Sequence, residues 1–78
     1  MPQTLNVTLD DSFGYGEIAR IIGKKHLPLK ILRSYCGFYI GTEDEDGPFS
    51  RESLEYYQTE KYALTALRNK TWTQRTEP

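Results

Sequence analysis

The sequence predicts a small α+β domain, with an antiparallel sheet of about three strands and helices packed on one face. Two observations lead to this class. Apolar and polar residues alternate in three stretches, as in half-buried strands, and two other stretches space their apolar residues as amphipathic helices do. The stretches follow one another in the order β-α-β-β-α. With 78 residues and no repeat or long linker, residues 1–78 are expected to form a single domain.

The first two elements are expected to be a strand at residues 5–9 and a helix from about Tyr15 to Ile22. Apolar side chains alternate with polar ones in the strand. In the helix, isoleucines three and four positions apart form one stripe. Gly23 stands where a C-terminal helix glycine is favoured, and the lysines after it suit the negative end of the helix.

Residues 29–58 are expected to form the β-hairpin around which the domain is organised. Asp46 and Gly47 are a turn signal, because glycine adopts positive φ without steric cost. One long strand is expected before this turn, with rings on both faces, as suits a central strand or a strand whose second face meets a partner. The returning strand is expected to lie at or near an edge, with Leu54 and Tyr56 as its core residues.

A second helix is expected over residues 60–70. Thr59 is a good N-cap residue, and alanine and leucine form an apolar stripe along the helix. Trp72 follows the helix and is expected to fold back as a lid on the core. Residues 73–78 are polar, so they are expected to fray.

The composition indicates a soluble cytoplasmic protein. Its hydrophobic fraction of 37% and charged fraction of 27% are typical of globular domains. Cys36 is the single cysteine, so no internal disulfide can form, as in a reducing compartment. No apolar run approaches the roughly 20 residues that span a bilayer, and the first residues lack the pattern of a signal peptide.

The sequence offers little for catalysis or metal binding. His26 and Cys36 are far apart along the chain, and Cys36 is expected on the core face, where a thiol is usually inert. One cysteine and one histidine cannot complete a structural zinc site. The acids of residues 43–46 lack the register of a calcium-binding EF-hand loop. No enzymatic activity, catalytic residue, metal or cofactor is therefore expected.

The charges are segregated along the chain, although the net charge is only −1. Residues 34–60 carry seven acids against Arg51, four of them at the hairpin turn. An acidic tip on a rigid hairpin can contact a basic groove, and Tyr and Arg are enriched at binding hot spots. The leading hypothesis is a protein-binding surface of Tyr39, Glu43, Asp44, Glu45, Asp46, Phe49, Arg51 and Tyr57. The alternative for the acids is a solvated hairpin turn without a partner, and the alternative for the rings is packing under a helix or in a homodimer.

A nucleic-acid-binding regulator is the second hypothesis. Its phosphate contacts would come from the basic segment, at Lys24, Lys25, Lys30 and Arg33. Residues 18–32 also have the spacing of a helix-turn-helix, but Pro28 would fall inside its recognition helix.

About half of the chain is similar in sequence to a known group of proteins. Between Gly37 and Arg75 it contains Gly-Phe-Tyr-Ile-Gly-Thr, Gly-Pro-Phe-Ser-Arg-Glu-Ser-Leu-Glu-Tyr-Tyr and Trp-Thr-Gln-Arg. This run resembles small uncharacterised accessory proteins of bacteriophages and prophages. The resemblance brings no catalytic motif. It implies a host protein as partner, in the host cytoplasm, because phage proteins of this size often block a host protein, as anti-CRISPR and other anti-defence inhibitors do.

Overall fold

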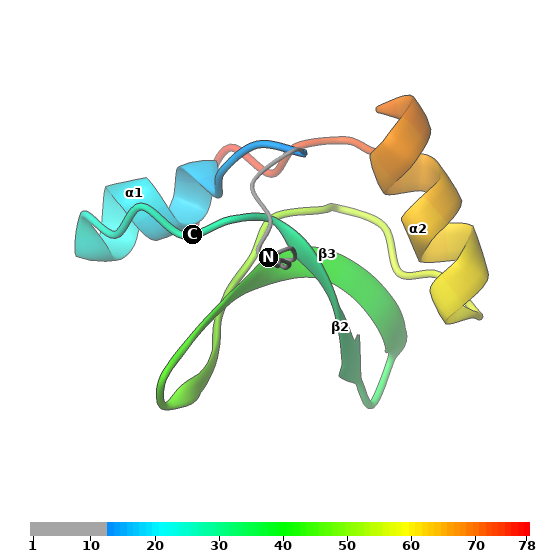
Figure 1. Ribbon diagram of the computed structural model, residues 1–78, viewed down its shortest axis with the longest axis horizontal. Coiled ribbons are helices and arrows are strands. Elements are labelled where there is room, and N and C mark those ends of the chain that lie inside the picture. Colours follow the sequence, from blue (N-terminus) through cyan, green and yellow to red (C-terminus); the bar gives the residue numbers. More distant parts are fainter. Residues whose placement is uncertain (1–12) are drawn as a thin grey trace, which may run out of the picture.

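The computed structural model describes residues 13–78, which form a three-stranded antiparallel sheet and two helices (Figure 1). In chain order the elements are α1 (Glu17–Gly23), β2 (Lys30–Ser34), β3 (Gly37–Asp44), β4 (Gly47–Arg51) and α2 (Glu60–Asn69). The strand order β2-β3-β4 makes β3 the central strand of this sheet. The predicted α+β class is confirmed. The strand predicted at residues 5–9 lies outside the described residues.

Both helices lie on the same side of the curved sheet (Figure 1). α1 contacts β4, whereas α2 contacts β2 and β3. After α2 the chain returns towards α1, where the C-terminal end lies (Figure 1). On this return Gln74 and Arg75 are hydrogen-bonded to Glu52, so this part of the segment predicted to fray is held in place.

The long strand predicted before the acidic turn is itself a hairpin, formed by β2 and β3. Ser34 Oγ accepts a hydrogen bond from the amide of Cys36 and donates one to the carbonyl of Gly37, both at 3.1 Å. Gly37 has a φ of 129°, which a residue with a Cβ rarely adopts. Cys36 is therefore exposed in the turn. Its predicted place on the core face was wrong, because the chain reverses where an uninterrupted strand was expected.

The prediction for the returning strand was also wrong in part. β4 ends at Arg51, and Glu52 and Ser53 are both fully buried, which breaks the alternation of a strand. Leu54 and Tyr56 consequently lie outside the core, 55% and 41% exposed. Strand alternation had assigned these two residues to the core only on the assumption that the strand continued past Arg51.

The main apolar core lies between α2 and the sheet. Thr59 caps α2 by accepting a hydrogen bond from the amide of Tyr62 at 3.0 Å, which confirms the predicted N-cap. Trp72 packs against the core, as predicted. The buried core residues are Leu29, Ile40, Ala66 and Leu67, with Phe13, Ile31, Tyr57 and Trp72 packed against them.

α1 begins two residues later than the sequence predicted and ends at Gly23. The left-handed residue at its end is Lys24, with a φ of 53°. The chain then runs without helix to β2, so the helix-turn-helix considered for this region is wrong. Within residues 13–78, no helix is both long and apolar enough to cross a bilayer.

Candidate protein-binding site at the β3–β4 hairpin

The acidic turn predicted from the sequence joins β3 to β4. Asp44 is the last residue of β3, and its Oδ1 accepts a hydrogen bond from the amide of Asp46 at 2.9 Å. Gly47 follows with a φ of 117°, the left-handed conformation expected of the turn glycine. We call the four acids of this turn, Glu43, Asp44, Glu45 and Asp46, the hairpin tip.

Two lysines from the basic segment hold the base of the hairpin tip. Lys25 Nζ lies 2.9 Å from Asp44 Oδ2, and Lys30 Nζ lies 2.7 Å from Glu43 Oε1. The hydrogen bond from Lys25, followed by that from the amide of Asp46, holds the pKa of Asp44 below its ordinary value. Asp44 in turn raises the pKa of Lys25. The charges that are segregated in the sequence therefore meet in the folded chain.

Glu45 and Asp46 are the exposed half of the hairpin tip. Neither side chain forms an ion pair with a described residue. Both lie close enough to Lys25 to raise its pKa, after the larger effect of Asp44. The hairpin tip therefore presents the unpaired carboxylates of Glu45 and Asp46, whereas those of Glu43 and Asp44 are paired with lysines.

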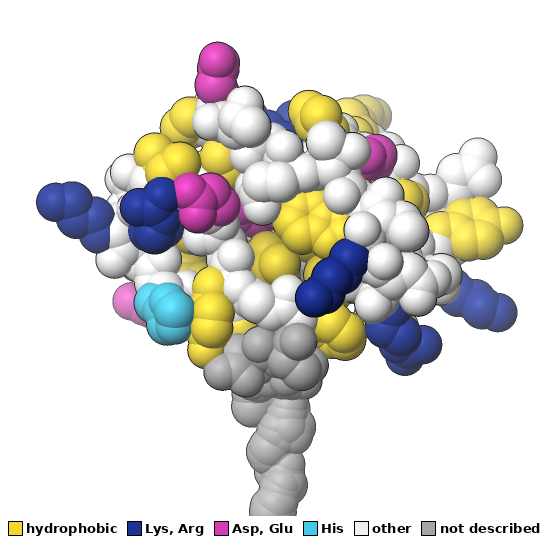
Figure 2. Space-filling view, turned by 90° about the horizontal axis from the view of Figure 1, so that it is seen from above, with side chains coloured by type: hydrophobic (Ala, Val, Ile, Leu, Met, Phe, Trp, Pro, Cys, Tyr) yellow, Lys and Arg dark blue, Asp and Glu magenta, His cyan; other side chains and the backbone are white. Residues whose placement is uncertain are grey.

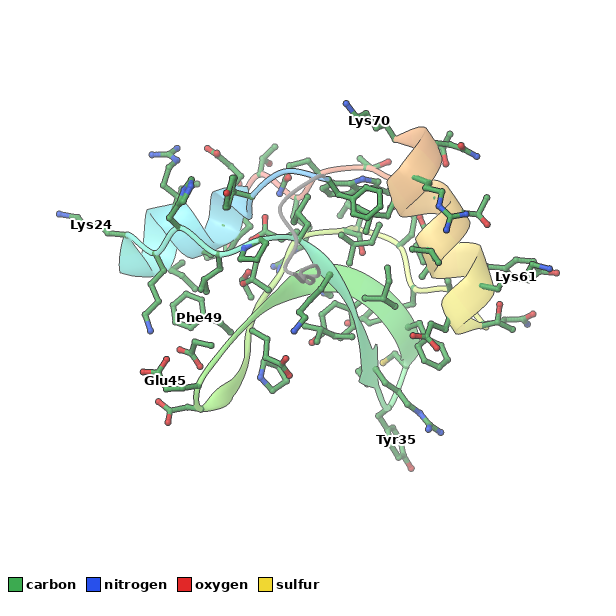
Figure 3. All side chains as sticks on the ribbon, viewed as in Figure 1. Lys24, Tyr35, Glu45, Phe49, Lys61 and Lys70 are labelled. Carbon is green, nitrogen blue, oxygen red and sulfur yellow. The ribbon has the colours of Figure 1, made fainter. Side chains whose placement is uncertain are left out.

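The structure separates the four basic residues of the nucleic-acid hypothesis. Lys25 and Lys30 pair with the hairpin tip. Lys24 points outward from the end of α1 (Figure 3). The guanidinium of Arg33 lies 5.8 Å from the ring centroid of Phe38. On the face shown in Figure 2, Lys and Arg side chains are dispersed rather than gathered into one patch. The four residues do not form a single free basic surface.

Phe49 joins the hairpin to α1. It has no partner in the strand register, because Thr42 pairs with Ser50 and Glu43 pairs with Pro48, which leaves Phe49 as the extra residue of a bulge. Its ring lies directly against Gly23, where a Cβ would come within 2.5 Å of the ring, and Lys25 Nζ lies 4.9 Å from its centroid. Figure 3 shows Phe49 between α1 and the end of the hairpin that carries Glu45.

Two other residues of the predicted protein-binding surface, Tyr39 and Tyr57, lie mostly inside the protein. Tyr39 is only 8% exposed, and its ring meets that of Tyr56 edge-on at 5.9 Å. Tyr57 pairs with Phe38 through two backbone hydrogen bonds and packs against the core. Burial raises the pKa of both Tyr39 and Tyr57. These two rings act mainly in packing.

Arg51 holds the far end of β4. Its Nη1 donates to the carbonyls of Ser53 and Leu54, at 2.8 and 3.1 Å, and its guanidinium lies 4.8 Å from the ring centroid of Tyr56. Arg51 and Leu54 also line a cleft of about 560 Å³, together with residues 73–78. The guanidinium is thus fixed in place rather than projecting.

Glu52 is a buried acid that the sequence did not indicate. It is fully buried, and its carboxylate reaches the first turn of α1. Gly16 permits this approach, since a Cβ there would come within 2.5 Å of Glu52 Oε2. Alternation places Glu52 on the same face as Leu54 and Tyr56, but a carboxylate there gave no sign of full burial, because charged side chains are rarely buried unless they have partners.

The structure assembles no catalytic group from His26 and Cys36. His26 stacks on Tyr15, with their ring centroids 3.6 Å apart, whereas Cys36 lies in the turn between β2 and β3. In the part of the chain that the structure describes, no three His, Cys, Asp or Glu side chains are grouped to hold a metal ion.

No protein-family model, curated protein or solved structure matches this chain. The geometry of the chain itself is therefore the basis for a functional proposal.

Proposed function

We propose that this chain is a non-enzymatic binding protein that contacts a basic surface of a partner protein through the hairpin tip. The observation that carries the proposal is the division of the tip into two pairs. Glu43 and Asp44 are held by lysines, whereas Glu45 and Asp46 extend beyond them, exposed and without an ion pair among the described residues. Unpaired charges on a well-anchored loop suit electrostatic recognition.

The two ion pairs also support the proposal through their effect on mobility. Lys25 comes from the connector after α1 and Lys30 from β2, so the hairpin is tied to two other segments. A loop that is ordered before association loses less conformational entropy on binding. The anchored tip therefore suits a contact surface better than a freely moving acidic loop would.

Within this proposal, the partner is a host protein and the chain acts as a phage accessory protein of the inhibitor type. The support is the resemblance of residues 37–75 to such proteins. Glu45, Asp46 and Phe49 are the proposed contact residues, and Arg51 supports them by holding the other end of β4. Tyr39 and Tyr57 keep the hairpin in place from the core.

The geometry supports nucleic-acid binding less well. A phosphate approaching Lys25 or Lys30 would meet the carboxylates that already pair with them. Lys24 and Arg33 remain, on separate elements. Two separated cations provide few of the phosphate contacts on which nucleic-acid affinity depends.

The test is affinity capture from host lysate with three immobilised proteins: the wild type, Glu45→Lys/Asp46→Lys and a control, Glu60→Lys/Glu77→Lys. The control makes the same charge change at exposed acids outside the hairpin. We expect a stoichiometric protein that the wild type and the control retain and the tip variant loses by about tenfold or more. Circular dichroism should show that all three are folded.

Two results would count against this function. One is equal capture of the same protein by the wild type and the tip variant. The other is micromolar binding to duplex DNA or RNA that weakens steeply with salt and is lost in Lys24→Ala/Arg33→Ala, which would favour the nucleic-acid hypothesis.

A further inference from the structure

The last turn of α1 carries two aliphatic side chains that the described residues, 13–78, leave about half exposed. Ile18 and Ala19, in the first turn, are 1% and 0% exposed. Ile21 and Ile22 are 46% and 47% exposed, although they lie three and four positions after Ile18 and so continue its apolar stripe. The last turn of α1 is therefore less covered than its first turn, although Gly23 at its end still contacts Phe49 of β4.

This uncovered turn lies next to the hairpin tip. Gly23, the residue after Ile22, rests on the ring of Phe49, which is itself only half-buried. Lys25, two residues further on, pairs with Asp44, so this part of the chain contacts the hairpin at two points. Figure 3 shows this order from α1 through Phe49 to Glu45. We call Ile21, Ile22 and Phe49 the apolar ledge.

The ledge and the tip together have the composition of a protein-contact surface. Single exposed aliphatic residues are common, but two in one helical turn, followed by a glycine that rests on a ring near unpaired charge, are a composition found at interfaces. The unpaired charge is negative, from Glu45 and Asp46. The complementary surface therefore combines aliphatic side chains with lysine or arginine.

We propose that the apolar ledge and the hairpin tip form one docking surface for a basic amphipathic segment of a partner protein. Aliphatic side chains of that segment pack on Ile21, Ile22 and Phe49, and its cationic side chains pair with Glu45 and Asp46. This inference rests on the proposed function and defines its partner's chemistry. Charge complementarity favours such a segment over a purely apolar occupant, which would leave the two carboxylates unpaired at the edge of the contact.

The test uses a fluorescein-labelled amphipathic peptide of leucine and lysine. Two matched peptides carry serine in place of leucine, or glutamate in place of lysine. We expect fluorescence anisotropy at physiological salt to give the leucine–lysine peptide a Kd at least about tenfold lower than either matched peptide. Amide chemical-shift changes on binding should concentrate at residues 20–25 and 44–49.

Variants of the protein separate the two halves of the surface. We expect Ile21→Ser/Ile22→Ser and Glu45→Lys/Asp46→Lys each to weaken binding of the leucine–lysine peptide by about tenfold. The matched control is Tyr35→Ser, because Tyr35 is a fully exposed ring that projects from the β2–β3 turn, away from the tip (Figure 3). This variant should bind as the wild type does.

The outcomes distinguish this inference from the proposed function. If the tip variant weakens binding and the isoleucine variant does not, the ledge has no part in docking, while the proposed function survives. If shift changes map away from both segments, or if the serine peptide binds as tightly as the leucine peptide, the docking surface is wrong. If the wild type sediments as a dimer and Ile21→Ser/Ile22→Ser as a monomer, the occupant is a second copy, which also overturns the proposal.

Discussion

The carboxylate of Glu52 accepts a hydrogen bond from the backbone amide of Ala19 at 3.0 Å, across 33 positions of sequence. Its other oxygen accepts from the amide of Ile18 at 2.9 Å. The side chain thus satisfies two of the amides that the first turn of a helix leaves without partners. Ser50 Oγ and Gln74 Nε2 donate the remaining two hydrogen bonds, at 2.6 and 2.8 Å.

Glu52→Gln should therefore destabilise the domain strongly. All four neighbours of the carboxylate donate hydrogen bonds, so the amide NH₂ of glutamine would face donors in a buried site. We expect the free energy of unfolding to fall by about 2–4 kcal/mol. Urea denaturation measures this loss. The control Glu45→Gln changes an exposed acid and should stay within about 0.5 kcal/mol of the wild type. Equal stability of both variants would show that Glu52 does not hold α1.

The cap of α2 gives a second prediction. Thr59→Ala removes the side-chain oxygen that accepts from the amide of Tyr62, and it should cost about 1 kcal/mol of unfolding free energy. Thr65→Ala changes the same residue type at an exposed position inside the helix, where alanine has the higher helix propensity. That variant should be neutral or slightly stabilising in the same thermal or urea measurement. A loss as large as that of Thr59→Ala would contradict the cap.

The pair of Lys25 and Asp44 predicts a dependence on pH. The pKa of Asp44 lies below the ordinary 3.8, so its contribution to stability is fully present above pH 3.8 and is lost as the pH falls through the lowered value. The pKa of Lys25 lies above the ordinary 10.5, so its contribution is present below pH 10.5 and is lost as the pH rises through the raised value.

NMR titration of the Asp44 carboxyl carbon checks this pair. In Lys25→Met the pKa of Asp44 should rise towards 3.8, because its largest cause of depression is removed. Lys24→Met removes a neighbouring charge that makes no ion pair with Asp44, and it should leave the titration almost unchanged. The same Asp44 titration in all three proteins would rule out the ion pair in solution.

The exposure of Cys36 predicts its reactivity. A thiol in the β2–β3 turn should react with an aromatic disulfide reagent in the native protein about as fast as in the denatured chain, because no packing shields it. Cys36→Ser should abolish the reaction and leave the free energy of unfolding within about 0.5 kcal/mol of the wild-type value. Strong protection of the thiol in the native state would mean that the turn is covered in solution.

The sequence alone determined the features that depend on neighbouring residues. The cap at Thr59, the helical stripe after it and the turn at Asp46 and Gly47 each follow from side-chain spacing or local backbone preference. All three are present in the structure, whose sheet and two helices confirm the predicted α+β class. The expectation that Trp72 covers the core is also confirmed, since a large ring just past an amphipathic helix has an apolar surface beside it.

The tertiary structure decided what depends on residues distant in sequence. Alternation cannot tell that Ser34 and Gly37 reverse the chain at Cys36, because a polar residue and a glycine also occur inside strands. Nor can it reveal that the Glu52 carboxylate holds α1, since burying a carboxylate requires donors from α1 and from Gln74 to converge on it. The hairpin tip depends on both: its acids are evident in the sequence, but only the fold brings lysines to Glu43 and Asp44 and leaves Glu45 and Asp46 without an ion pair among residues 13–78.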